Sequence, residues 1–109
     1  MRILVVAAAV PLLLTACSMT LPVQGMVQGS GETFAGTATG EMDGAGTLTI
    51  RSAKTTCTGA FVYVTRRQGS GTFSCADGRS GPFEFASTGT RGTGTGDLGG
   101  QKFTFTFGG

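Results

Sequence analysis

Three cysteines are the side chains best suited to chemistry in this chain of 109 residues, because histidine is absent. Cys57 and Cys75 are too far apart in sequence for a Cys-x-x-Cys redox motif. In an exported protein such a pair forms a structural disulfide, which we expect here. A redox-active or metal-binding pair is the alternative, and it would have to work without any histidine. Cys17 stands apart from both, near the N-terminus.

Residues 69–81, "GSGTFSCADGRSG", raise the possibility of a phosphate-binding or metal-binding loop. Phosphate loops of the Gly-x-Gly kind need a helix N-terminus directly after them, whereas "GTFSC" has the residues of a strand. Asp77-Gly78 is a strong signal for a hairpin turn. The related stretch "GTGTGDLGG" offers only Asp97, too few oxygens for calcium. We therefore expect turns and strands, with no metal and no cofactor.

General acid–base catalysis most often uses histidine, and the six carboxylates are scattered along the chain. Lys54 and Lys102 have the positions of solvated lysines at strand ends. These features predict a protein that is not an enzyme. Arg66 and Arg67 form a candidate binding pair at an expected hairpin tip, suited to acidic glycans or lipid headgroups, although solubility alone would explain them.

The N-terminal sequence "MRILVVAAAVPLLLTAC" has the order of a secretory signal peptide. Arg2 provides a positive charge, and residues 3–14 form an apolar run too short for a spanning helix. Without Arg2, the eight Lys and Arg residues become seven against six Asp and Glu. A nearly neutral chain of this kind does not suit nucleic acid, which requires a concentrated basic face.

The end of this segment, Leu14-Thr15-Ala16-Cys17, resembles the lipobox of bacterial lipoproteins. The resemblance implies that residues 1–16 are removed and that Cys17 carries acyl chains, anchoring the protein to a membrane of the cell envelope. Ser18 after the cysteine implies the outer membrane, facing periplasm or surface, where the organism has one. Residues 17–30, which contain Pro22 and two glycines, are expected to be a flexible tether between the anchor and the domain.

Residues 31–109 predict one small all-β domain, an antiparallel meander of repeated β-hairpins. In "KFTFTFG" the phenylalanines alternate with threonines, as in a half-buried strand. The stretches "GAGTLTI", "GSGTFSC" and "GTGTGDL" recur at steps of about 24 residues, a period typical of stacked hairpin units. A register that pairs Cys57 with Cys75 also pairs Gly59 with Phe73 and Phe61 with Gly71.

The repeat resembles the MORN repeat, a β-hairpin unit, in "CTGAF", "GSGTF" and "ADG". That resemblance implies a scaffold for protein or lipid contacts. We therefore expect a membrane-anchored envelope lipoprotein that acts as a structural or protein-interaction module, with an envelope protein as a possible partner. The alternative is a module that binds a glycan, peptidoglycan or a small ligand through its aromatic face or its arginines.

Overall fold

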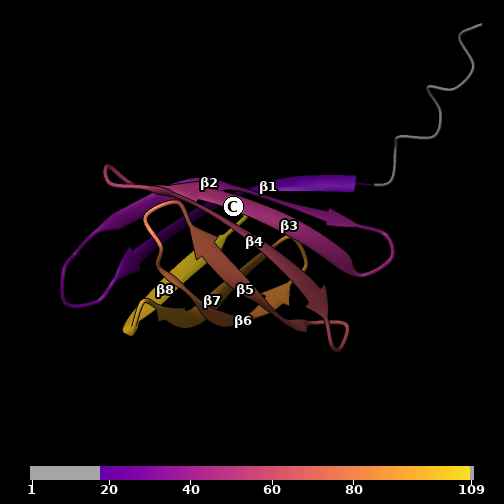
Figure 1. Cartoon of the computed structure of the whole chain (residues 1–109). Helices are drawn as coiled ribbons and strands as arrows, with labels where there is room; N and C mark the ends of the chain where they lie inside the picture. Colours follow the sequence, from indigo (N-terminus) through magenta and orange to yellow (C-terminus); the bar gives the residue numbers. More distant parts are fainter. Residues whose placement is uncertain (1–17, 109) are drawn as a thin grey trace, which may run out of the picture.

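The computed structural model describes residues 18–108 and contains eight β-strands there, arranged as one closed antiparallel barrel (Figure 1). The strands are β1 (Ser18–Val27), β2 (Thr33–Glu41), β3 (Ala45–Arg51), β4 (Thr56–Tyr63), β5 (Gln68–Cys75), β6 (Ser80–Thr88), β7 (Arg91–Leu98) and β8 (Gln101–Phe107). Each strand pairs with the next in sequence, and β1 closes the barrel against β8. The all-β antiparallel meander is therefore confirmed, and its closure into a barrel is new.

Alternation along each strand separates the interior of the barrel from its outer surface. Phe103 and Phe105 are buried on β8, while Phe83 and Phe85 are buried on β6 with Glu84 exposed between them. An eight-stranded barrel encloses a space that side chains can just fill. The aromatic faces predicted from period-two alternation are thus the core.

The register predicted for the hairpin between β4 and β5 is confirmed. Cys57 lies opposite Cys75, Gly59 opposite Phe73, and Phe61 opposite Gly71. Similar pairing continues around the barrel: the ring of Phe105 lies over Gly94, where an added methyl group would collide with it. Glycines therefore make room inside the barrel for the large rings of neighbouring strands.

The three recurring stretches form β3, β5 and β7, and each pairs with the strand that follows it. The repeat unit is accordingly a two-stranded hairpin, as its length predicted. The related stretch "GETFAGTATG", which starts at Gly31, supplies β2. The hairpin units succeed one another around the barrel wall.

The expected tether over residues 17–30 is wrong for residues 18–27, because these form β1. Val23 and Val27 point inward and are buried, with Gly25 between them. Pro22 was expected to belong to a linker. It lies instead in β1, at a position that pairs with β2 but not with β8, because pairing with β8 begins at Val23. Proline is tolerated at such a strand edge because no neighbour needs its missing N–H. The barrel therefore includes residues 18–27 and does not start at residue 31.

The two ends of the barrel differ. We call the end that carries the β1–β2, β3–β4, β5–β6 and β7–β8 connections the closed end, because buried side chains fill it. We call the other end the open end; it carries the start of β1, the β2–β3, β4–β5 and β6–β7 connections, and the last residues of β8. The candidate site lies at the open end.

Candidate functional site

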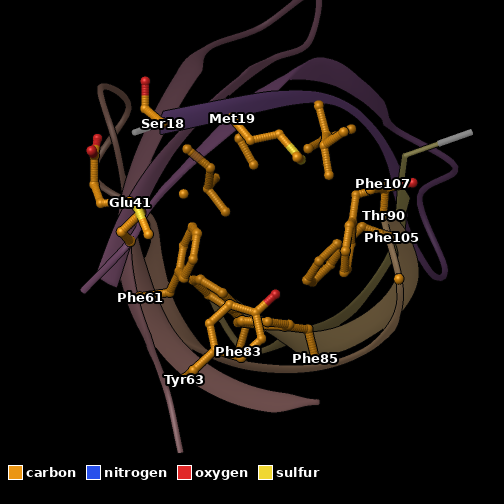
Figure 2. A pocket seen from close by; sticks show the side chains of 17 residues that line it. Ser18, Met19, Glu41, Phe61, Tyr63, Phe83, Phe85, Thr90, Phe105 and Phe107 are labelled. Atoms are coloured by element: carbon orange, nitrogen blue, oxygen red, sulfur yellow. The ribbon is translucent and has the colours of Figure 1, made fainter. Parts of the chain in front are cut away.

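A cavity of about 390 Å³ opens at the open end of the barrel. Looking into it, Figure 2 shows aromatic side chains from several strands pointing inward around one hollow. Its lining consists of Ser18, Met19, Leu21, Val23, Ala38, Gly40, Glu41, Met42, Leu48, Phe61, Tyr63, Phe83, Phe85, Gly89, Thr90, Phe105 and Phe107. Volumes of a few hundred Å³ are typical of small-molecule sites, which are mostly apolar with a few polar groups.

One wall of the cavity is an aromatic cluster from β4, β6 and β8. Phe85 is at its centre: its ring centroid lies 5.3 Å from that of Phe61, 5.2 Å from that of Tyr63 and 5.8 Å from that of Phe107. All three pairs meet edge to face, with interplanar angles of 81°, 87° and 87°. This geometry is the favoured one for aromatic rings, so the cluster forms a fixed wall.

The opposite wall comes from β1, β2 and β3 and carries smaller side chains. Ala38 and Gly40 occupy inward positions of β2, and Leu21 and Leu48 face them from the flanking strands. Nothing lies within 4 Å of the position where a side chain at Gly40 would begin. The hollow exists because small residues on this side do not fill the space that the rings leave.

Polar groups are few and lie near the mouth. The Tyr63 hydroxyl and Ser87 Oγ are 3.4 Å apart, and Ser87 is buried. The backbone N–H of Ser87 donates to the carbonyl of Arg67 at 2.7 Å, which ties the β4–β5 loop to β6. Glu41 and Thr90 lie on the exposed rim. A ligand would therefore meet an apolar interior and hydroxyl groups at the entrance.

Arg66 and Arg67, the candidate binding pair, are exposed in the β4–β5 loop beside this mouth. Among the other arginines of residues 18–108, Arg51 and Arg79 lie at the closed end. Arg91 begins β7 at the open end. The two arginines thus flank the cavity entrance without lining the cavity.

At the closed end, Arg79 forms a network with two carboxylates. Its guanidinium donates to both carboxylate oxygens of Glu32, at 2.8 and 2.9 Å, and to Asp77 at 3.0 Å. The Ser52 hydroxyl donates to Glu32 at 2.7 Å. These hydrogen bonds from Arg79 lower the pKa of Glu32 from 4.5 to about 2, despite the opposing effect of burial. The pKa of Asp77 is lowered for the same reason.

Cys57 and Cys75 lie at the same closed end, with Cα atoms 3.8 Å apart and sulfur atoms at the distance of a disulfide. Cys17, the predicted lipidation site, lies outside the described residues, as does the predicted signal peptide.

Lys54 and Lys102 are exposed. Over residues 18–108 there is no group of three His, Cys, Asp or Glu side chains that could hold a metal ion. The same residues include no helix long and apolar enough to cross a membrane.

Sequence reasoning found the aromatic wall but missed the cavity. The alternating phenylalanines were expected on the buried faces of strands, and the structure places Phe83, Phe85 and Phe105 there. The residues of the opposite wall were missed, above all Leu21 and Ala38. A signal was available, because Leu21, Val23 and Val27 fit period-two alternation once Gly25 is counted as an inward position.

Comparison with known proteins finds no matching family model and no matching curated protein. Among solved structures, the chain is similar to a redesigned β-barrel, mFAP1, bound to DFHBI. The two share 14% sequence identity and superpose with a TM-score of 0.68, over 83% of this chain and 92% of that one. At this identity the likeness concerns the fold alone.

Proposed function

We propose that this protein is an envelope lipoprotein whose barrel binds a small, largely apolar molecule in its open end. The observation that carries the proposal is the aromatic cavity of about 390 Å³, which lies at the mouth of an otherwise packed barrel. Ligand pockets of this kind are concave, apolar and already formed before binding. This puts binding of a small ligand ahead of the purely structural or protein-interaction role expected from the sequence.

The lining favours a ligand with an apolar body and one polar end. Edge-to-face packing around Phe85 leaves ring surfaces toward the hollow, which suits flat or chain-like apolar groups. At the entrance, the hydroxyls of Tyr63 and Thr90 line the cavity and can accept or donate a hydrogen bond. Glycans and peptidoglycan carry polar groups over their whole surface, so the cavity suits them less well.

Binding without catalysis is part of the proposal. Glu41 and Tyr63 are the titratable side chains of the lining, and Glu41 lies exposed on the rim. Acid–base catalysis would require two titratable groups that act on the same point of a bound molecule. The lining of the cavity does not provide such a pair. The barrel of the same fold is described as bound to DFHBI, a precedent for a small molecule in such a barrel. The argument for this chain rests on its own cavity.

The envelope location rests on the sequence. A signal-like segment followed by Leu14-Thr15-Ala16-Cys17 supports export, removal of residues 1–16 and acylation of Cys17. A protein with two or three acyl chains on one residue stays on the membrane, whereas a single chain holds it only marginally. Mass spectrometry of the mature protein should find an acylated Cys17 at the N-terminus, and any other N-terminus would refute this location.

A cavity-filling variant tests ligand binding. Ala38→Phe places a ring into the hollow from β2, and Ala35→Phe places the same ring on the outer face of the same strand. Binding of N-phenyl-1-naphthylamine, an uncharged fluorescent probe, is measured by its emission. We expect Ala38→Phe to weaken binding at least tenfold and Ala35→Phe to leave it unchanged. Equal binding by all three proteins, or none by the unmodified protein, would refute the proposed cavity function.

A further inference from the structure

We propose that the open end of the barrel docks on the membrane surface, with apolar side chains of its rim among the lipid headgroups and with the cavity mouth turned toward the bilayer. The docking surface consists of Met19, Met42, Val62, Tyr63, Val64, Arg66 and Arg67. Its partner is a bilayer that contains anionic phospholipid. This surface does not depend on ligand binding by the cavity, so the two proposals can fail separately.

Exposed large apolar side chains are concentrated at the open end. Of the six such side chains among residues 18–108, five belong to the docking surface, and Met26 alone lies elsewhere, on the outer wall of β1. Met42 is 79% exposed at the β2–β3 turn, and Val64 is 70% exposed in the β4–β5 loop. Exposed apolar groups that cluster at one place mark an interaction site, whereas scattered ones need no explanation.

The direction of β1 brings the chain's anchor to this same end. Ser18 lines the cavity mouth, and β1 runs from there to the closed end. Cys17 directly precedes it, and consecutive Cα atoms are about 3.8 Å apart. Because β1 replaces most of the expected tether, acyl chains on Cys17 would hold the rim at the bilayer. A barrel docked by its closed end would need a long linker between Cys17 and the barrel, whereas β1 already begins at Ser18.

Charge on the rim favours one side of it. Arg66 and Arg67 are exposed next to Val64, an arrangement that suits a segment at the headgroup level of an anionic membrane. Their loop is ordered, since Thr65 Oγ1 accepts hydrogen bonds from the N–H groups of Arg67 and Gln68 at 3.2 and 3.0 Å. The neighbouring β2–β3 turn on the rim carries Glu41 and Asp43. We therefore expect the β4–β5 side to approach anionic lipid more closely.

The closed end lacks these features. It exposes the cations Arg51, Lys54 and Lys102, and Arg79 binds both Glu32 and Asp77, but its loops expose no large apolar side chain that could enter the headgroup region. If the cavity binds an apolar ligand, as proposed above, then this orientation lets the ligand enter from the lipid side. That last consequence rests on the proposed ligand binding, whereas the docking itself rests on the proposed acylation of Cys17 and not on the cavity.

Depth-dependent fluorescence quenching tests the orientation in the processed, acylated protein. Single cysteines replace Met42 or Met26, and each is labelled with bimane on the oxidised protein, in which Cys57 and Cys75 do not react. The two methionines make a matched pair, because both are exposed and both variants share the anchor. In phosphatidylcholine vesicles with nitroxide-labelled lipid, we expect the Met42→Cys probe to be quenched at least threefold more than the Met26→Cys probe.

Anionic lipid provides a second measurement. Adding phosphatidylglycerol should increase quenching of a probe at Val64→Cys, and Arg66→Ser with Arg67→Ser should abolish that increase. Equal quenching at Met42 and Met26, or stronger quenching at Met26, would overturn the proposal, as would a protein that does not stay with the vesicles. A Met42 probe that remains in water in native membranes, while a photo-cross-linker there captures a protein, would make the rim a protein interface instead.

Discussion

The closed and open ends of the barrel are built from the same eight strands but by opposite means. At the closed end, the Cys57–Cys75 pair joins two strands, and Arg79 binds Glu32 and Asp77 across the loops. At the open end, aromatic rings surround a hollow and apolar side chains face solvent. Each strand of the closed barrel runs from one end to the other. Interactions at the closed end can therefore stabilise the strands, while the open end remains available for binding.

This division has a physical reason. A binding site leaves apolar surface unburied and therefore gives up packing free energy, which other parts of a small domain must supply. Here the cross-link, the ion pairs and the buried Ile50, Leu98 and Phe103 all lie toward the closed half. The comparison predicts that substitutions at the closed end change stability, whereas substitutions at the open end change binding.

The largest effect on stability is expected from removing the cross-link. In Cys57→Ala with Cys75→Ala, the free energy of unfolding should fall by about 3 kcal/mol, because a closed loop of 18 residues no longer restricts the unfolded chain. Denaturant titration measures this change. Binding of the fluorescent probe should stay within twofold of the unmodified protein at temperatures where the variant is folded. If the double variant is as stable as the unmodified protein, or if it folds but no longer binds the probe, the division between the two ends is wrong.

Two glycines on β2 provide a smaller and more local test. Gly36 and Gly40 face the interior of the barrel from one strand. A methyl group at Gly36 would collide with the Thr49 carbonyl and lie 2.7 Å from Ile50 Cα, both of which are backbone, whereas nothing lies near one at Gly40. We expect Gly36→Ala to lower the free energy of unfolding by about 1–3 kcal/mol and Gly40→Ala to leave it unchanged. Thermal unfolding of the two variants measures this difference. An equal loss of stability in both would show that the open end is packed as tightly as the rest of the barrel.

Much of this fold can be predicted from the sequence because its information is local. Alternation in "KFTFTFG" and the turn signal Asp77-Gly78 each act within a few residues, and the cysteines fix the register between β4 and β5. That register also places Gly59 opposite Phe73 and Gly71 opposite Phe61. Strands, turns and neighbouring pairs are therefore predictable from this one chain.

Closure of the barrel is not local and was missed. It depends on β1 pairing with β8, which brings Val23 opposite Phe107 from the far end of the chain. The inward pattern of β1 is hard to recognise because Gly25 takes the inward position between Val23 and Val27, and Pro22 comes directly before them. Glu32 and Arg79, which form an ion pair, are also far apart in sequence, by 47 residues, and the cavity depends on which small residues face the rings. None of these leaves a pattern within one strand.

The smallest expected effect is the pH dependence of stability that the Glu32–Arg79 pair gives the closed end. A lowered pKa means that Glu32 contributes stability above pH 4.5, and that this contribution is lost as the pH falls toward about 2. Arg79 is 23% exposed, so solvent screening reduces the contribution to about 1 kcal/mol. Glu32→Gln should lower the free energy of unfolding by that amount at pH 7 and remove the corresponding loss between pH 4.5 and 2. Glu84→Gln, an exposed carboxylate on the outer face of β6, is the control and should leave both unchanged. If the two variants behave alike in urea titrations across this range, the network does not stabilise the closed end, and the cross-link and packing must hold it alone.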